Sequence, residues 1–326
     1  MQALRVDALS EDLSGVSLVE TPAPTRNEGE VLVRVHAASL NFPDLLMTRG
    51  AYQFKPGLPF ISGLECAGEV IEADADSGFQ PGDRVMGGNK TGAFAEIASL
   101  PARGLSHVPS NFSYAQGAAM GAAYSTAYTG LVELCGLRSG QSVMVTGASG
   151  GVGLAAVDLA NALGATTIAA TGIAGKREAI TALAAPDHTI ISEGRFREEI
   201  SAITDGRLCD IVFDNVGGDV FDECTRCVTF AGQLLLVGFT SGRIPQIATN
   251  IPLIKGFSIV GLRAGEYARR FPERGGAIKR AIREMAEAGR IHPAVGAQLP
   301  LSQWRTGFEA MAKRELVGKV VFEPGN

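Results

Sequence analysis

The sequence predicts an α/β protein with two domains, one rich in β-strands and one built on a doubly wound parallel sheet. Its 326 residues are 46% hydrophobic and 19% charged, which is enough for two buried cores. The first third carries short runs punctuated by prolines, with apolar and polar residues in alternation. From residue 115 to about residue 261, apolar runs typical of buried strands alternate with helical segments.

The first third indicates a compact β module. The run "EVLVRVHAAS" places Val31, Val33 and Val35 at a period of two, which is typical of a strand with one buried face. The run "GLECAGEVIEA" carries Gly63 and Gly68 inside a second strand-like pattern. No sustained helical period occurs before about residue 113, so we expect a compact all-β module there.

The middle of the chain indicates a parallel sheet covered by helices on both faces. Its strand-like runs are "SVMVTG", "TTIAAT", "HTIIS", "DIVFDNVG" and "GQLLLVGF". An amphipathic helix, "AIKRAIREMAEAG", and a last strand, "GKVVFEP", follow, and that strand has no place in the completed sheet. We therefore assign residues 1–116 and 262–326 to the β-rich domain and residues 117–261 to the α/β domain.

Composition and charge disfavour several classes of protein. The formal net charge is -5 and there is no basic run, so we expect no nucleic-acid partner and no membrane partner. The first residues, "MQALRVDALSEDL", lack the apolar core of a signal peptide, and uncharged stretches such as residues 108–132 contain too many Ser, Gly, Pro and Asn to span a bilayer. We expect a cytoplasmic protein.

The five cysteines are irregularly spaced, which favours reduced thiols over a disulfide framework. Cys224 and Cys227 form a C-x-x-C pair, but no second pair and no histidine lies near them in the sequence. Because a structural zinc site needs four ligands, a purely structural role is favoured for this pair, and we expect no metal site.

The stretch "SVMVTGASGGVGLAAVDLANALGATTIAAT", residues 142–171, indicates a dinucleotide-binding turn. A strand breaks at Gly147, Gly150, Gly151 and Gly153, and a helix follows directly. Such glycines let the backbone approach a pyrophosphate, which the N–H groups and the positive end of the helix then face. The alternative is a turn that only packs a strand against a helix. A P-loop is excluded because Gly153 is followed by Leu and Ala.

The same unit favours NADPH over NADH. An NAD site usually carries an acid about 20 residues past the glycines, but the first acid after Asp158 is Glu178. Instead Gly172 is followed by Lys176 and Arg177, which suit a 2′-phosphate. The alternative is that these cations only begin a solvated helix.

Seven motifs together resemble the zinc-free quinone oxidoreductase branch, which is zeta-crystallin-like, of the medium-chain dehydrogenase/reductases. They are "SLNFPDLLMTRGAY", "GLECAGEV", "GDRV", "AAYSTAYTGL", "GASGGVG", "DNVGG" and "VGKVVF". The resemblance covers nearly the whole chain. It implies a GroES-like catalytic domain, a Rossmann NADPH-binding domain, an active site in the cleft between them, and a homodimer in which "GFSIVGLRA" could supply an edge strand.

By this resemblance, the positions of the catalytic zinc ligands hold Asn41, Leu64 and Ala122, so no catalytic zinc is expected. Asn41 and Tyr52 would line the substrate pocket and hydrogen-bond an acceptor oxygen, although Asn41 could only order a turn before Pro43 and Tyr52 could be a core residue. The implied cofactor contacts are Asn41, Thr126, Ser149, Gly150, Gly151, Val152, Gly172, Lys176, Ser192, Val216, Gly238, Phe239 and Lys319.

The resulting functional hypothesis is zinc-independent hydride transfer from NADPH to a quinone or an activated enone. Such acceptors are strongly electrophilic, so they need positioning more than activation by a metal. Two alternatives remain open. The first is an NADPH-dependent enoyl-thioester or 2-alkenal reductase of the same superfamily, and the second is a non-enzymatic cofactor-bound or RNA-binding relative.

Overall fold

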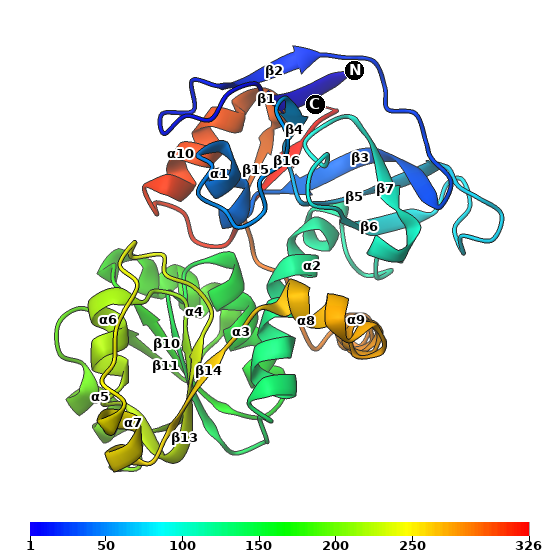
Figure 1. The fold of residues 1–326 in the computed structure, drawn as a ribbon. Coiled ribbons are helices and arrows are strands. Elements are labelled where there is room, and N and C mark those ends of the chain that lie inside the picture. Colours follow the sequence, from blue (N-terminus) through cyan, green and yellow to red (C-terminus); the bar gives the residue numbers. More distant parts are fainter. Residues whose placement is uncertain (326) are drawn as a thin grey trace. The chain divides into compact units, whose positions relative to one another are not determined.

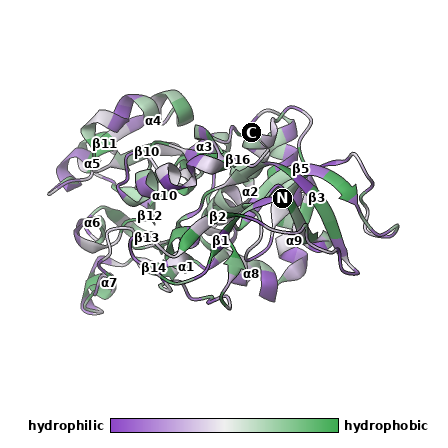
Figure 2. Ribbon diagram, turned by 90° about the horizontal axis from the view of Figure 1, so that it is seen from above, coloured by the Kyte–Doolittle hydropathy of each residue, from purple (hydrophilic) through white to green (hydrophobic). Residues whose placement is uncertain are grey.

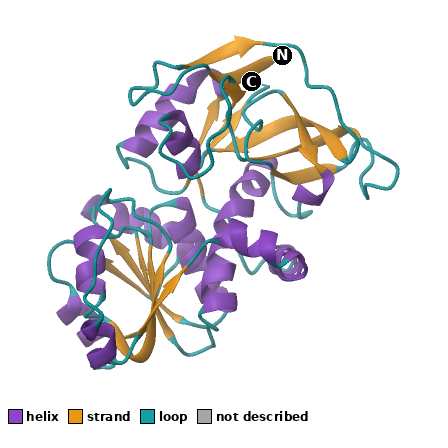
Figure 3. Ribbon diagram, in the orientation of Figure 1, coloured by secondary structure: helices purple, strands orange, loops and turns teal. Residues whose placement is uncertain are grey.

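The computed structural model describes residues 1–325, which form two compact units (Figure 1). The first unit comprises Met1–Gly121 and the chain from Val295 onward, and the second comprises Ala122–Ala294. The first unit is rich in strands and the second is a parallel sheet with flanking helices (Figure 3). The predicted fold class is therefore confirmed.

The first unit contains two sheets. A small antiparallel sheet has the order β2-β1-β4, and the larger one has the order β15-β16-β3-β5-β6-β8, with β7 pairing with β3. The strands are β1 (Gln2–Val6), β2 (Val16–Glu20), β3 (Glu30–Ser39), β4 (Phe60–Ile61), β5 (Glu65–Glu72), β6 (Arg84–Gly88), β7 (Ile97–Pro101), β8 (Leu105–His107), β15 (Val295–Pro300) and β16 (Lys319–Glu323).

The alternation seen in the sequence explains how β3 lies in its sheet. Val31, Val33 and Val35 are buried, whereas Arg34 and His36 are exposed, as a strand with one covered face requires. The covered face belongs to a core with T-shaped ring contacts, including Trp304 with Phe308 at a centroid distance of 5.8 Å. The first third is not all β, because a short helix, α1 (Phe42–Thr48), begins at the Asn41 cap. The other helical segments of this unit are η1 (Ala102–Gly104), η4 (Leu301–Gln303) and α10 (Trp304–Ala312), with α1 and α10 in contact (Figure 1).

The second unit is a parallel sheet with the order β11-β10-β9-β12-β13-β14. This order is that of two mononucleotide-binding halves, and it reverses next to β9, where a dinucleotide site is expected. The strands are β9 (Ser142–Thr146), β10 (Thr166–Thr171), β11 (His188–Ile191), β12 (Cys209–Asp214), β13 (Val228–Leu236) and β14 (Ser258–Gly261).

Helices such as α3 and α4 cover this sheet because they bury apolar residues. In α4 the charged first residues are followed by hydrophobic ones, and Ile180 and Ala184 are buried (Figure 2). The helical segments are α3 (Gly151–Ala162), η3 (Ala174–Lys176), α4 (Arg177–Ala184), α5 (Arg197–Ile203), α6 (Gly218–Cys224), α7 (Asn250–Lys255), α8 (Ala264–Arg270) and α9 (Pro272–Glu287). The segments α2 (Tyr114–Tyr128) and η2 (Thr129–Leu134, a π-helix) precede them.

The unit boundaries differ from those we expected from the sequence. Residues 262–294 lie in the second unit rather than the first, where polar contacts hold α8 and the segment after α9. The Tyr267 hydroxyl donates to Glu133 Oε2 in η2 at 2.9 Å, and the His292 N–H donates to Asp158 Oδ2 in α3 at 2.8 Å. The chain returns to the first unit only at β15.

Two further features bear on the expectations from the sequence. None of the helices described here combines the length and apolarity needed to cross a membrane. The strand β14 is the outermost strand beside β13, and the side chains of Leu253 and Ile254 nearby in the sequence are largely exposed. Dimerisation through this edge stays a prediction.

Candidate active site

The glycine turn is formed where β9 ends and α3 begins. Gly147 has a φ of +58°, a conformation that favours glycine. A Cβ at Gly153 would lie 2.4 Å from the Gly147 carbonyl oxygen, so the helix packs directly on the turn. The N–H groups of the first helical turn, which lack intrahelical acceptors in any α-helix, belong here to Gly151, Val152 and Gly153.

Two positions of this region have the open backbone that a dinucleotide needs. A Cβ at Gly150 would meet only the Gly147 oxygen, at 3.6 Å, and a Cβ at Gly172 would meet no atom within 4 Å. A side chain at Gly153 would therefore clash where strand and helix meet. At Gly150 and Gly172, the two positions expected to face phosphates, the backbone has free space beside it. The residues present fit a bound dinucleotide.

The expected adenosine end is assembled at the carboxyl end of β10. Thr171 is buried there, and its carbonyl oxygen accepts the Ser192 N–H at 2.9 Å, because β11 pairs with β10 and Ser192 directly follows β11. Lys176 ends the short segment η3 and is only 7% exposed. The structure thus brings the ends of β10 and β11 together at Ser192, and η3 follows β10 two residues later.

The expected nicotinamide contacts gather around a buried carboxyl that sequence reasoning missed. Asp214 ends β12, and its Oδ1 accepts the Thr146 hydroxyl at 2.6 Å and the Val216 N–H at 3.0 Å. Burial raises the pKa of the Asp214 carboxyl. Its only signal in the sequence was its place in "DNVGG", between an apolar strand and two glycines.

Asp214 fixes the loop that carries the three predicted residues. Val216 lies beside the glycine turn, since a Cβ at Gly147 would come within 3.1 Å of its Cγ2. The Gly238 N–H donates to the Asp214 carbonyl oxygen at 3.3 Å. A Cβ at Gly217 would lie 2.8 Å from the ring of Phe239. The structure therefore brings Val216, Gly238 and Phe239 together.

In the first unit, the sheet register brings together three polar residues that are far apart in the sequence. The strand β3 lies between β5 and β16, and it is antiparallel to both. Its last residue, Ser39, pairs with Glu65 on one side and with Val321 on the other. Asn41, which follows β3 and caps α1, therefore lies near the first residues of both neighbouring strands, Glu65 and Lys319.

These residues form a buried hydrogen-bonded cluster, which we call the Asn41 cluster and define as Asn41, Asp44, Glu65 and Lys319. The Lys319 ammonium donates to Asn41 Oδ1 at 2.6 Å and to Glu65 Oε1 at 3.0 Å. Asn41 Nδ2 donates to Glu65 Oε1 at 2.9 Å and to the Ser39 carbonyl oxygen at 3.1 Å. Asn41, Glu65 and Lys319 are each no more than 7% exposed.

Asp44 completes the cluster from the first turn of α1. Its Oδ2 accepts the Asn41 backbone N–H at 2.8 Å, while its buried Oδ1 has no partner among the described residues. Burial raises the pKa of the Asp44 carboxyl to about 7, against the opposing effects of the Asn41 N–H and the Lys319 charge. Sequence reasoning missed Asp44 and Glu65, whose signals were charged residues in the otherwise apolar runs "NFPDLL" and "GLECAGEV".

The remaining predicted residues have less specific surroundings. Tyr52 is half-buried and packs against the core of the first unit, which agrees with the core interpretation. Thr126 lies on α2 in the second unit, and its hydroxyl donates to the Ala122 carbonyl oxygen at 2.7 Å. Neither environment assigns a role to the residue.

The three residues at the positions that correspond to zinc ligands do not form a set of metal-binding side chains. Asn41 is bound by Lys319 and Glu65, and Leu64 and Ala122 carry no donor atom in their side chains. Across residues 1–325, no group of three or more His, Cys, Asp or Glu side chains is arranged to hold a metal ion. Cys224 and Cys227 are buried in the core of the second unit, where burial raises the pKa of the Cys227 thiol to about 12.

The two units match two known domain families. Residues 27–110 match the alcohol dehydrogenase GroES-like domain, and residues 151–287 match the zinc-binding dehydrogenase family. A quinone oxidoreductase-like protein 2 homolog from Nematostella vectensis is 36% identical over 328 residues, which cover 96% of this chain and 87% of that protein. The chain belongs to the medium-chain dehydrogenase/reductase family, in its quinone oxidoreductase-like branch.

Two further relatives bear on the cofactor and the acceptor. The structure of the mycobacterial protein Rv1454c complexed with NADPH has a TM-score of 0.91 and 26% identity, and the match covers 99% of this chain and 100% of that one. Part of the erythronolide synthase EryA2 of Saccharopolyspora erythraea is 34% identical over 326 residues, which are 94% of this chain and 8% of that synthase. This chain is an oxidoreductase of the family with a nicotinamide-cofactor fold.

We expect Asp44→Asn to remove a pH dependence of stability from the first unit. The pKa of this carboxyl is about 7 in the folded chain and has the ordinary value of 3.8 when unfolded, so only the folded chain keeps the proton between those values. The free energy of unfolding therefore falls by a few kcal/mol as the pH rises from about 4 to about 7, and the contribution is fully present only below about pH 4.

The measurement is urea unfolding at about pH 5 and about pH 8, followed by fluorescence of Trp304, the single tryptophan, which is buried in the first unit. The control is Asp76→Asn, which changes an exposed carboxyl of the same unit. Equal pH slopes for wild type and Asp44→Asn would contradict the assignment.

Proposed function

We propose that this protein is an NADPH-dependent quinone oxidoreductase that transfers hydride without a zinc ion. The observation that carries the proposal is the open glycine turn at β9 and α3, combined with the absence of an acid at the end of β10 and the presence of Lys176 as the last residue of η3. The NADPH complex of the mycobacterial relative supports the same cofactor.

The second unit would hold the cofactor along the carboxyl ends of its strands. Helix-terminal N–H groups bind the pyrophosphate, and cationic or hydroxyl groups bind the 2′-phosphate. The Asp214-fixed loop would hold the nicotinamide half. We assign the pyrophosphate to Ser149, Gly150, Gly151 and Val152. The adenosine end with its 2′-phosphate is assigned to Gly172, Lys176 and Ser192, and the nicotinamide half to Val216, Gly238 and Phe239.

The first unit would supply the polar groups that orient the reactants. When bound, NADPH supplies the hydride, and the protein contributes orientation and electrostatics. Tyr52 carries a hydroxyl that can donate to an acceptor oxygen as charge develops on it. Asn41 is held rigidly by Lys319 and Glu65, so it offers a fixed polar group for the reactants.

A second candidate is reduction of an enoyl thioester or a 2-alkenal by the same cofactor. The match with part of erythronolide synthase EryA2 favours keeping it, because that match extends over 94% of this chain. The cofactor-binding residues are the same for both candidates, so the acceptor has to be decided by kinetics.

We expect Lys176→Ala to weaken NADPH binding about 10- to 150-fold and to leave NADH binding nearly unchanged. A charge-assisted hydrogen bond to the 2′-phosphate contributes roughly 1.5 to 3 kcal/mol, and NADH has no such phosphate. Both dissociation constants are measured by the fluorescence of the bound dihydronicotinamide. The matched control is Arg177→Ala, because the neighbouring Arg177 guanidinium instead donates to the Thr189 carbonyl oxygen on β11. Equal losses for both cofactors in Lys176→Ala would mean that Lys176 supports the fold.

We expect quinones such as 1,4-benzoquinone or 9,10-phenanthrenequinone to be reduced faster than enoyl thioesters, alkenals or simple ketones. A quinone becomes aromatic when it accepts hydride, so orientation alone can suffice, whereas a simple ketone needs stronger stabilisation of its oxyanion. The measurement is kcat/KM for a panel of acceptors at fixed NADPH. If a crotonyl or acryloyl thioester ranks above every quinone, the second candidate replaces the first.

A further inference from the structure

The chain passes from one unit to the other at two places, which we call the connections. The first lies within α2, between Gly121 and Ala122, and the second lies between Ala294 and Val295. Because the units are joined covalently only at these two places, a movement of one unit relative to the other has to be taken up there. What holds the connections therefore matters for the motion of the chain.

One oxygen atom of Asp158, on α3, binds a residue beside each connection. The Tyr124 hydroxyl, on α2, donates to Asp158 Oδ2 at 2.5 Å, and the His292 backbone N–H donates to the same Oδ2 at 2.8 Å. Such short bonds to a carboxylate are charge-assisted and roughly twice as strong as neutral hydrogen bonds. A single side chain of the second unit thus holds both connections.

Burial makes the two bonds of Asp158 depend on each other. Tyr124 is 1% exposed and Asp158 is 9% exposed. Burial raises the pKa of the Asp158 carboxyl, whereas the bonds from the Tyr124 hydroxyl and the His292 N–H lower it. A buried carboxylate that loses one donor is poorly solvated, so it is driven toward water and releases the other donor as well.

Water has a route to this carboxylate. Asp158, Arg290 and His292 line a cavity of about 610 Å³, together with residues at the ends of α3 and α4. The His292 ring lies beyond ordinary hydrogen-bond length, with its Nδ1 3.6 Å from Asp158 Oδ1. A carboxylate released from its donors would therefore be hydrated in the cavity rather than left in the core.

We propose that Asp158 couples the two connections, so that they open together rather than independently. Asp158 is a positioning residue, because it acts through α2 and through the segment after α9 and needs no contact with a substrate or a cofactor. The same helix α3 begins at the glycine turn, so both connections are tied to the element that we assign to the pyrophosphate. The inference does not depend on the proposed function.

The test is amide hydrogen exchange, followed residue by residue by NMR, in wild type and in Tyr124→Phe. The His292 amide donates directly to Asp158, so its exchange rate reports release of the second connection. Tyr124→Phe removes only the donor on α2. The coupling predicts that exchange at His292 nevertheless becomes about tenfold faster or more, together with exchange in α2 near Tyr124.

Two results of this comparison would overturn the proposal. If Tyr124→Phe accelerates exchange in α2 and leaves the His292 amide unchanged, the connections open independently. Val145 and Phe213 lie in the central strands β9 and β12 and are fully buried. If their amides accelerate as much as that of His292, the Tyr124 hydroxyl only stabilises the second unit as a whole.

Two variants in the second unit serve as controls. Tyr128→Phe changes the same helix, and the Tyr128 hydroxyl makes no hydrogen bond among residues 1–325, so exchange at His292 should stay unchanged. His292→Ala keeps the backbone N–H and removes the ring, so exchange in α2 should also change little. An acceleration in His292→Ala as large as that in Tyr124→Phe would assign the coupling to the ring and contradict the role of the shared oxygen.

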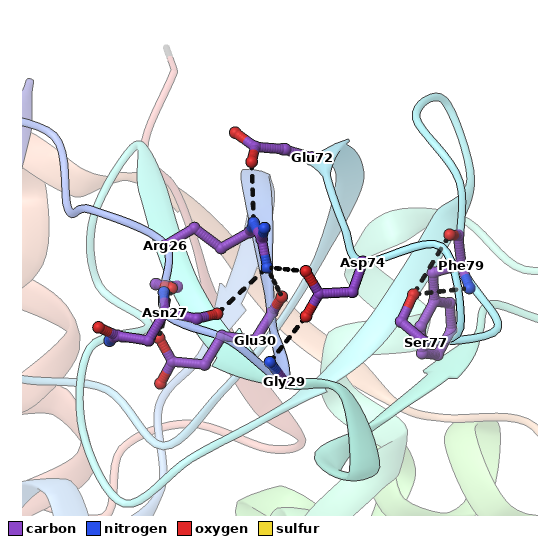
Figure 4. Close-up of polar contacts among 9 residues, drawn as sticks. Arg26, Asn27, Gly29, Glu30, Glu72, Asp74, Ser77 and Phe79 are labelled. Atoms are coloured by element: carbon purple, nitrogen blue, oxygen red, sulfur yellow. Dashed lines mark hydrogen bonds and ion pairs between the residues drawn. The ribbon is translucent and has the colours of Figure 1, made fainter.

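Arg26→Met is the control in the first unit, because Arg26 is another side chain that joins two segments. It donates to Glu72 Oε1 at 2.9 Å and pairs with Asp74 Oδ1 at 2.6 Å (Figure 4). This variant should speed exchange at Gly29, whose N–H donates to Asp74 Oδ2 at 2.7 Å, and leave the His292 amide unchanged. Faster exchange at His292 in this variant would mean that the amide reports general loosening of the chain, and the coupling would be rejected.

Discussion

The pairing of β16 with β3 is the constraint on which the polar chemistry of the first unit depends. It brings Lys319, near the end of the chain, beside Asn41 and Glu65. Without that register, a carboxylate and a carboxamide would lie in an apolar environment with no cation to bind them. The strand β16 therefore also supplies the cation of the Asn41 cluster.

In the second unit, too, a buried side chain holds the backbone that we propose to bind the cofactor. Asp214 binds the Thr146 hydroxyl at the end of β9 and the N–H of Val216 on the loop after β12. It thereby joins the strand before the glycine turn to the loop expected to meet the nicotinamide. Each unit thus has a buried acid that accepts a backbone N–H beside a strand end, Asp44 from Asn41 in the first unit and Asp214 from Val216 in the second.

The sequence predicted features that depend on near neighbours and missed those that depend on register. The glycine turn, the parallel strands and the alternation in β3 are local patterns, and the structure contains all of them. The partnership of Glu65 with Lys319 joins residues 254 positions apart, and no local pattern signals it. The inclusion of residues 262–294 in the second compact unit also depends on distant contacts, since the Tyr267 hydroxyl in α8 donates to Glu133.

The central claim is that hydride passes from NADPH to the acceptor without a metal ion. The most direct measurement uses protein freed of metal by prolonged chelation, with NADPH carrying deuterium at one face of C4 and a quinone as acceptor. The account predicts undiminished activity, loss of deuterium from the cofactor for only one of the two labelled faces, and a slower rate with that label. Activity that disappears with the metal and returns with stoichiometric zinc would contradict it.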